Sequence, residues 1–169
     1  MKRLVLCRHA KSSWKDMALR DIDRPLNKRG GKDAPMMGKR LADRGLKPDL
    51  IISSSAKRAL KTARRLAKKA GYPKKNIVIE KDMYGASPEL LLARVRRFDN
   101  SRAVVVMIGH NPAMTSFANL LGGLDIYNIP TCGIVALDFD VGAWKDVGRK
   151  KGKLVFFDYP RKTDNQEAG

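Results

Sequence analysis

The sequence predicts a three-layer α/β/α sandwich with a mostly parallel central sheet. Short apolar runs of strand length alternate along the 169 residues with longer stretches of helical periodicity. Most of these runs are apolar throughout rather than alternately apolar and polar, which is typical of parallel strands buried on both faces. Helices of about a dozen residues between such strands cover the two faces of a sheet.

Six apolar runs are the candidate strands. They span residues 4–7, 50–52, 77–79, 103–108, 133–139 and 154–157. We interpret the first four as strands buried on both faces, because all their side chains are apolar. The last two follow the helical part of the chain and are predicted to close the sheet.

Four stretches of helical periodicity lie between these strands. They cover residues 32–44, 56–70, 88–98 and 112–121. Gly45 and Gly71 follow the first two stretches, at the position where a helix commonly ends on a glycine. Pro112 opens the fourth stretch, since proline is well suited to the first helical turn.

The chain length fits one domain, which we expect to span residues 1–160 ahead of a polar tail at 161–169. A domain of this size buries roughly two-thirds of its unfolded surface and needs neither disulfides nor structural zinc. Cys7 and Cys132 lie in apolar runs without C-x-x-C spacing, so we expect buried, reduced thiols and a cytoplasmic location. The apolar stretches are too short to span a bilayer, and we expect no signal peptide.

The chain carries 35 Lys and Arg against 17 Asp and Glu, a formal net charge of +18. This excess implies an anionic partner, which could be a phosphate group, an acidic protein or nucleic acid. The basic stretch 57–69 contains no aromatic residue for base stacking, and the stretch 145–153 has only Trp144 beside it. Walker-type and Rossmann-type nucleotide loops do not occur. We therefore expect no specific nucleic-acid binding, only weak and salt-sensitive attraction to polyanions.

Both histidines of the chain, His9 and His110, lie just after predicted strands. Ligands bind at the carboxyl ends of the strands in open parallel sheets, so this position favours a functional role. One such histidine alone would suit an ordinary strand-end residue bonded to a backbone carbonyl, but two at equivalent places weaken that interpretation. A zinc site is discounted, because no cysteine or carboxylate cluster accompanies the pair.

Arginines lie at the same strand ends. Arg8 precedes His9, and the serine-rich turn 53–55 leads into a helix that carries Arg58 in its first turn. A helix N-terminus with a guanidinium suits an oxyanion such as phosphate. Arg58 could equally be a solvated charge among its basic neighbours, and spacing alone leaves both interpretations open.

An imidazole can attack phosphorus to form a covalent intermediate, while arginines neutralise the phosphoryl oxygens without a metal.

Four short motifs lie in order between residues 6 and 111. They are Leu-Cys-Arg-His-Ala at 6–10, Asp-Arg-Pro-Leu-Asn-Lys-Arg-Gly at 23–30, Ser-Ala-Lys-Arg-Ala-Leu-Lys-Thr-Ala at 55–63 and Val-Met-Ile-Gly-His-Asn at 106–111. The first resembles the R-H-G signature of the histidine phosphatase (phosphoglycerate mutase-like) superfamily, and the others resemble segments that accompany it there. Within that superfamily, the short chain and the Arg-Pro-Leu element resemble the SixA-type phosphohistidine phosphatases.

The resemblance implies a phosphoglycerate mutase-like fold without the large lid insertion of the mutases. It also implies a phosphatase that needs no metal or cofactor and in which His9 becomes phosphorylated. Arg8, Arg58 and His110 would complete the phosphate pocket, and Arg24 would make an additional contact with the ligand. Such an open site suits phosphohistidine in a protein, since the phosphorylated side chain must reach the pocket while attached to its domain.

The sequence departs from the family's pattern in three places. Ala10 replaces the usual glycine, a change that does little harm where the local φ is negative. Lys15 stands where many relatives carry a phosphate-contacting asparagine, and it either binds the anion or points to solvent. The proton-donating glutamate of the mutase-like members has no clear counterpart, and we interpret Glu80, Asp82 and Glu89 as surface carboxylates. A phosphohistidine substrate eases this difficulty, because an imidazole leaving group is protonated more readily than an alkoxide.

Two alternatives stand beside a phosphohistidine phosphatase. The first is a phosphatase or mutase for small phosphate esters, which the same residues would serve. The second is a non-enzymatic protein that binds polyanions or nucleic acid, suggested by the charge alone. The expected partners are a phosphorylated protein with a phosphohistidine-bearing domain, or a small phosphate compound. Neither a specific nucleic acid nor a membrane is expected.

Overall fold

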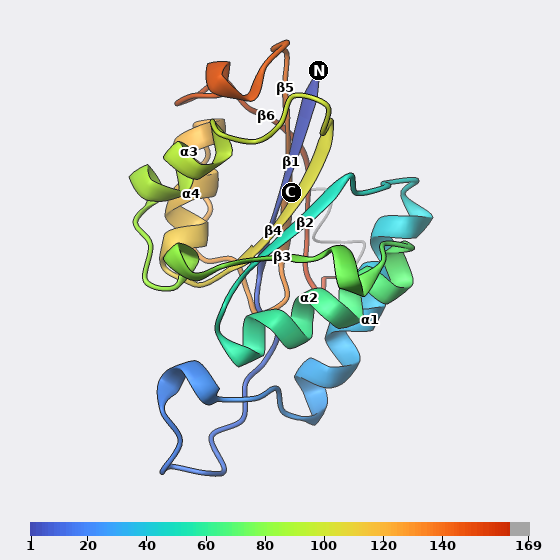
Figure 1. Ribbon diagram of the computed structural model, residues 1–169, viewed down its shortest axis with the longest axis vertical. Coiled ribbons are helices and arrows are strands. Elements are labelled where there is room, and N and C mark those ends of the chain that lie inside the picture. The colour runs from blue at the N-terminus through green and yellow to red at the C-terminus, as the bar shows by residue number, and fades with distance from the viewer. Residues whose placement is uncertain (163–169) are drawn as a thin grey trace.

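A six-stranded sheet organises the computed structural model, which describes residues 1–162 (Figure 1). The strands are β1 (Lys2–Arg8), β2 (Leu50–Ser54), β3 (Val78–Glu80), β4 (Val104–Gly109), β5 (Ile134–Phe139) and β6 (Lys153–Asp158). Their order across the sheet is β3-β2-β4-β1-β5-β6. The first four strands are mutually parallel, whereas β5 and β6 join antiparallel at one side. The predicted mostly parallel sheet is confirmed.

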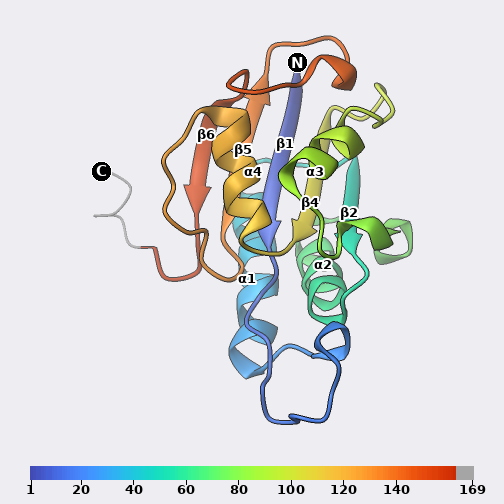
Figure 2. The same cartoon turned by 90° about the vertical axis from the view of Figure 1, so that its left-hand side faces the viewer.

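Four α-helices in the described residues cover the two faces of this sheet (Figure 2). They are α1 (Lys28–Asp43), α2 (Lys57–Ala70), α3 (Pro88–Val95) and α4 (Ala113–Gly122). The pair α1 and α2 lies on one face, and the pair α3 and α4 lies on the other. Side chains of β1 alternate between the two resulting cores, with Leu4 and Leu6 in one and Val5 and Cys7 in the other. The three-layer prediction is therefore confirmed.

One predicted strand, at residues 77–79, differs from its expectation. Residues 77–79 were expected to be buried on both faces, but β3 is the edge strand of the sheet. Val78 is 38% exposed and Ile79 is 49% exposed. The expectation of burial was wrong here, because an apolar run shows strand propensity without showing how many neighbours the strand has.

The helix ends follow their local sequence signals. Gly71 ends α2 with a φ of 75°, the left-handed conformation that glycine adopts without strain. The N-terminus of α1 differs from its expectation, because this helix begins at Lys28 rather than at residue 32. The Asn27 side chain accepts a hydrogen bond of 2.8 Å from the backbone N–H of Gly30 and so caps the helix. The cap adds a first turn that apolar periodicity did not reveal.

The carboxyl ends of β1, β2 and β4 lie at the same edge of the sheet, which is its lower edge in both overall views (Figures 1 and 2). The connection from β1 to α1, drawn in blue, extends beyond this edge and contains a short 3₁₀ turn, Asp21–Asp23. Among the described residues, the connections here are loops and short turns with no inserted lid. This edge is where the parallel sheet predicts a ligand.

Cys7 and Cys132 are both buried and free, as the apolar runs around them predicted. The cytoplasmic location inferred from them stays a prediction. No helix within residues 1–162 is long and apolar enough to cross a membrane. The predicted tail at 161–169 lies, beyond its first two residues, outside the described part of the chain.

Close packing of α1 against α2 provides a test of this fold. A Cβ on Gly38 would lie 2.4 Å from the backbone carbonyl oxygen of Leu66, so Gly38→Ala must push the two helices apart. We expect a loss of about 2 kcal/mol in the free energy of unfolding, measured by urea denaturation.

Gly31→Ala in the same helix is the matched control. A Cβ there meets only the flexible end of the Arg65 side chain, at 3.0 Å. The helix preference for alanine should leave this variant as stable as the parent or more stable, by up to about 1 kcal/mol. Equal destabilisation by both substitutions would contradict the proposed close approach.

Candidate functional site

Two imidazoles meet where β1 and β4 end. Arg8 pairs with Gly109 in the parallel register, so His9 and His110 leave the two strands side by side. The backbone N–H of His9 donates to the carbonyl oxygen of Gly109 at 3.0 Å and extends this pairing by one residue. The ring centroids lie 5.2 Å apart. The structure therefore brings the two histidines of the chain together at one edge of the sheet.

The His9 ring is buried and has a defined proton position. Its Nδ1 lies 2.8 Å from the carbonyl oxygen of Ala10, which can only accept, so Nδ1 carries the proton in the neutral ring. Its Nε2 faces the Arg58 guanidinium, with Nε of that side chain donating at 3.4 Å. Burial, followed by smaller contributions from the charges of Arg58 and Arg8, lowers the pKa of His9 to about 4. The ring is therefore neutral near pH 7, with its lone pair on Nε2.

His110 is also held neutral. Its Nε2 lies 2.8 Å from the Ser54 hydroxyl oxygen, and its Nδ1 lies 3.5 Å from Nη2 of Arg58. Burial lowers the pKa of His110 to about 3, with smaller contributions from the neighbouring His9 and Arg58. The edge of the Tyr84 ring packs against His110, with the centroids 5.5 Å apart.

Arg58 links the two imidazoles to the loop that follows β1. The side chain lies in the first turn of α2 and is buried. Besides its contacts with His9 and His110, its Nη1 donates to the backbone carbonyl of Asp21 at 2.6 Å, and its Nη2 donates to the Asp21 carboxylate at 2.9 Å. Of the two interpretations left open by the sequence, the solvated helix charge was wrong.

Arg8 and Arg24 each have buried guanidinium N–H groups with no hydrogen-bond acceptor among the described residues. Nη1 of Arg8 donates to the carbonyl oxygen of Ile129 at 2.9 Å, but its Nε has no partner in the described residues. Nε and Nη1 of Arg24 likewise lack a hydrogen-bond partner within residues 1–162. The Arg24 guanidinium stacks 3.6 Å from the centre of the Trp14 ring and approaches the Asp21 carboxylate to 3.7 Å. Unpaired buried guanidinium donors are costly, so this arrangement favours an anionic ligand.

Thr62 fixes the backbone around His9, a function that the sequence did not assign. Its hydroxyl accepts from the Ala10 N–H at 2.9 Å and donates to the carbonyl oxygen of Arg58 at 2.8 Å. Ala10 itself does not have a positive φ, which is the condition under which alanine is expected to do little harm at this position. The bridge ties the segment after β1 to the first turns of α2.

Asp21 and Tyr84 are the site residues that sequence reasoning missed. The Tyr84 hydroxyl donates to the Asp21 carboxylate at 2.7 Å, and Arg58 donates to the same oxygen. The hydrogen bond from Tyr84, followed by the effect of Arg58, lowers the pKa of Asp21. The spacing of Asp21 and Arg24, which places both on one side of a helical turn, was the available signal.

The remaining candidate residues form no hydrogen bond or ion pair with the two imidazoles among the interactions described. Lys15 is exposed and makes no side-chain contact with the cluster among the interactions described. Glu80 accepts from Nε of Arg94 at 2.9 Å, while Asp82 and Glu89 are exposed. The interpretation as surface carboxylates is confirmed for Asp82 and Glu89, whereas Glu80 is partly buried in its ion pair with Arg94.

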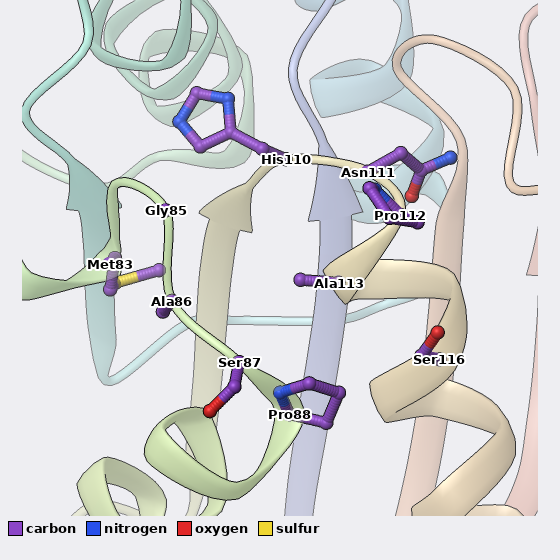
Figure 3. Close-up of a pocket in the computed structure, with 10 residues that line it drawn as sticks. All are labelled: Met83, Gly85, Ala86, Ser87, Pro88, His110, Asn111, Pro112, Ala113 and Ser116. Carbon is purple, nitrogen blue, oxygen red and sulfur yellow. The ribbon is translucent and has the colours of Figure 1, made fainter.

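A cavity of about 330 Å³ adjoins His110 (Figure 3). It lies between the segment 83–88 and the first turns of α4, and its walls are mostly apolar. Met83, Ala86 and Ala113 contribute to these walls. Space is therefore present beside the imidazole pair for a group larger than phosphate.

Comparisons with known proteins agree with this geometry. Residues 4–84 match the model of the histidine phosphatase superfamily (branch 1). The chain is 33% identical over 153 residues to an uncharacterised chloroplastic protein of Arabidopsis thaliana, covering 86% of this chain and 70% of that protein.

Solved structures extend the likeness to nearly the whole chain. A protein of Agrobacterium tumefaciens assigned as the phosphohistidine phosphatase SixA is 30% identical, with a TM-score of 0.79, and the match covers 94% of this chain and 98% of that one. The protein histidine phosphatase SixA in complex with tungstate has a TM-score of 0.80 at 19% identity, covering 94% of this chain and 97% of that one, and so shares the fold. The chain is a phosphatase that belongs to the histidine phosphatase superfamily, with its SixA-type members as structural neighbours.

Proposed function

We propose that this phosphatase works without a metal through a covalent phosphohistidine at His9, and that its substrate is phosphohistidine in a protein. The observation that carries the proposal is the state of His9. Its ring is neutral, its Nδ1–H donates to the carbonyl oxygen of Ala10, and its Nε2 lone pair faces the guanidinium of Arg58. A neutral imidazole oriented in this way is a nucleophile for phosphorus.

The reaction has two displacements at phosphorus. In the first, the Nε2 lone pair of His9 forms a bond to phosphorus while the bond to the leaving group breaks, and the leaving group departs with its electron pair. In the second, water attacks the phosphorylated His9, inorganic phosphate leaves, and the neutral imidazole returns. Two such steps replace one difficult displacement.

The positive groups around His9 stabilise the transferring phosphoryl group. Arg58 lies against Nε2, the atom that forms the new bond, and Arg8 and Arg24 have unpaired donors to offer to phosphoryl oxygens. We assign Arg8, Arg58 and His110 to the phosphate pocket and Arg24 to an additional ligand contact. His110 becomes a donor when the bound phosphate raises its pKa, because a nearby negative charge favours the protonated ring. Fixed charges of this kind account for most of catalysis in phosphoryl transfer.

Two features support phosphohistidine as the substrate. The chain is 30% identical to the Agrobacterium protein assigned as SixA over nearly its full length. In addition, Glu80 is paired with Arg94, and Asp82 and Glu89 are exposed, so none of the three is an evident acid for an alkoxide leaving group. An imidazole leaves without that help, because its ring nitrogen takes a proton readily near neutral pH.

A phosphatase for small phosphate esters is the second candidate. The cavity beside His110 favours it, since a small leaving group could enter there. Its apolar walls offer few partners for the hydroxyl groups of a sugar, and unpaired polar groups weaken binding. A non-enzymatic polyanion-binding protein ranks lower, because only the net charge suggests it. Polyanion binding also does not account for the neutral, oriented ring of His9.

The nucleophile is tested by His9→Ala. We expect kcat to fall by about a thousandfold or more, since the covalent step is lost, while tungstate or phosphate still binds to the arginines. Steady-state kinetics and calorimetry measure the two properties. The parent enzyme should also yield a phosphoenzyme that is stable in alkali and labile in acid. Activity near the parent level in His9→Ala would refute the proposal.

The buried imidazoles predict an unusual titration. NMR of the ligand-free enzyme should show His9 taking a proton near pH 4 and His110 near pH 3, rather than near the ordinary value of about 6.5. Between these values the unfolded chain binds more protons than the folded one, so the free energy of unfolding should fall as the pH drops from about 6.5 to 4. His9→Gln removes one of these groups and should make that fall smaller. A His9 transition above pH 6 would contradict the neutral nucleophile.

The substrate class is tested by comparing kcat/KM on a protein that carries phosphohistidine with kcat/KM on sugar phosphates. We expect the phosphohistidine protein to be preferred by at least about a hundredfold. Its imidazole leaving group needs no carboxylic acid side chain as a proton donor, whereas the alkoxide of a sugar phosphate does. A preference for the esters would establish the second candidate instead.

A further inference from the structure

The Asp21 carboxylate lies in the candidate phosphate pocket without a part in the reaction described so far. Its side chain is 50% exposed, and it accepts hydrogen bonds from Arg58 at 2.9 Å and Tyr84 at 2.7 Å. Its charge is close enough to His9 and His110 to raise the pKa of both rings, against the larger lowering by burial. An acidic group therefore faces the place where an anion is expected.

This position has an electrostatic cost for phosphate binding. A carboxylate near a phosphoryl group repels it, and it also neutralises part of the Arg58 charge. An asparagine could accept the same hydrogen bonds from Arg58 and Tyr84 without the negative charge. Orientation of Arg58 therefore does not explain why the residue is acidic.

A negative charge at this point distinguishes among phosphorylated substrates. A phosphohistidine ring takes a proton on the nitrogen that does not carry phosphorus, and the resulting cation would be attracted to a carboxylate. A phosphate ester with a carboxylate of its own, such as 3-phosphoglycerate, would be repelled. The cavity beside His110 begins next to Tyr84, with Met83 and Gly85 in its wall, so space for a leaving group borders the same side of the site.

We propose that Asp21 is a specificity-determining residue that accepts a hydrogen bond from the protonated imidazole of a phosphohistidine substrate and disfavours esters with a second anionic group. The proposal rests on the proposed function. As His9 Nε2 bonds to phosphorus, the substrate's P–N bond breaks and its electrons stay on the ring nitrogen. The ring leaves as neutral imidazole. Its other nitrogen keeps the proton whose hydrogen bond Asp21 accepted. Asp21 gains and loses no proton.

The test is Asp21→Asn, with Asp23→Asn as the matched control. Asp23 lies in the same 3₁₀ turn but pairs with the exposed Arg20, at 2.7 Å. We expect Asp21→Asn to lower kcat/KM for a phosphohistidine peptide by about tenfold or more, the loss of one charge-assisted hydrogen bond. The ratio of kcat/KM for the peptide to kcat/KM for p-nitrophenyl phosphate, whose leaving group needs no added proton, should fall by about tenfold in Asp21→Asn and stay unchanged in Asp23→Asn. Inhibition by 3-phosphoglycerate should tighten by about tenfold.

Asp21→Glu keeps the charge and should keep the parent's preference between the two substrates. Equal losses on both substrates in Asp21→Asn, with unchanged inhibition by 3-phosphoglycerate, would overturn the inference and leave Asp21 as a residue that only orients Arg58. A parent enzyme that hydrolyses p-nitrophenyl phosphate but not the phosphohistidine peptide would instead refute the proposed substrate. In that case the inhibition constants still decide whether the Asp21 charge selects against anions.

Discussion

The pairing of β1 with β4 is the constraint on which the site depends. Both strands are parallel and in a fixed register, so the residues that follow Arg8 and Gly109 emerge together. Each strand is buried on both faces, with successive side chains in opposite cores. A slip of one residue would exchange those cores and turn one imidazole away from the other. The packing that stabilises the fold therefore also brings His9 and His110 together.

Burial gives this pair its chemical character. Exposed histidines would be partly protonated near pH 7, and a protonated ring has no lone pair for phosphorus. In this protein the surrounding core and the guanidinium of Arg58 keep both rings neutral. Asp21 pairs with the Arg58 guanidinium, and this carboxylate offsets part of the cationic field. Nucleophile, cation and carboxylate thus depend on one another, and a change in any of them alters the other two.

Much of the architecture could be predicted from the sequence, because apolar runs and helical periods directly reflect which side chains are buried. The exposed edge position of β3 could not be predicted, since Val78 and Ile79 are apolar like the residues of the buried strands. Trp144 is a similar case. It lies beside a basic stretch in the sequence but is fully buried, with its indole N–H bonded to the carbonyl oxygen of Arg102.

The site divides in the same way. The residues at strand ends and in the first turn of α2 could be located, because the sheet topology brings those positions to one edge. Asp21 and Tyr84 could not, because they come from connections whose paths no local pattern determines. They meet each other across 63 positions of sequence, and Asp21 meets Arg58 across 37. Contacts of this kind depend on the completed fold.

The stacking of Trp14 on Arg24 places an intrinsic fluorophore beside the candidate phosphate pocket. The chain has two tryptophans, and Trp144 lies fully inside the core at the far side of the sheet from α1 and α2. Trp14 is 58% exposed and has the Arg24 guanidinium against its ring. An anion that draws Arg24 towards itself changes the surroundings of one indole and leaves the other as a constant background. We therefore expect intrinsic fluorescence to report occupancy of the pocket without an attached label.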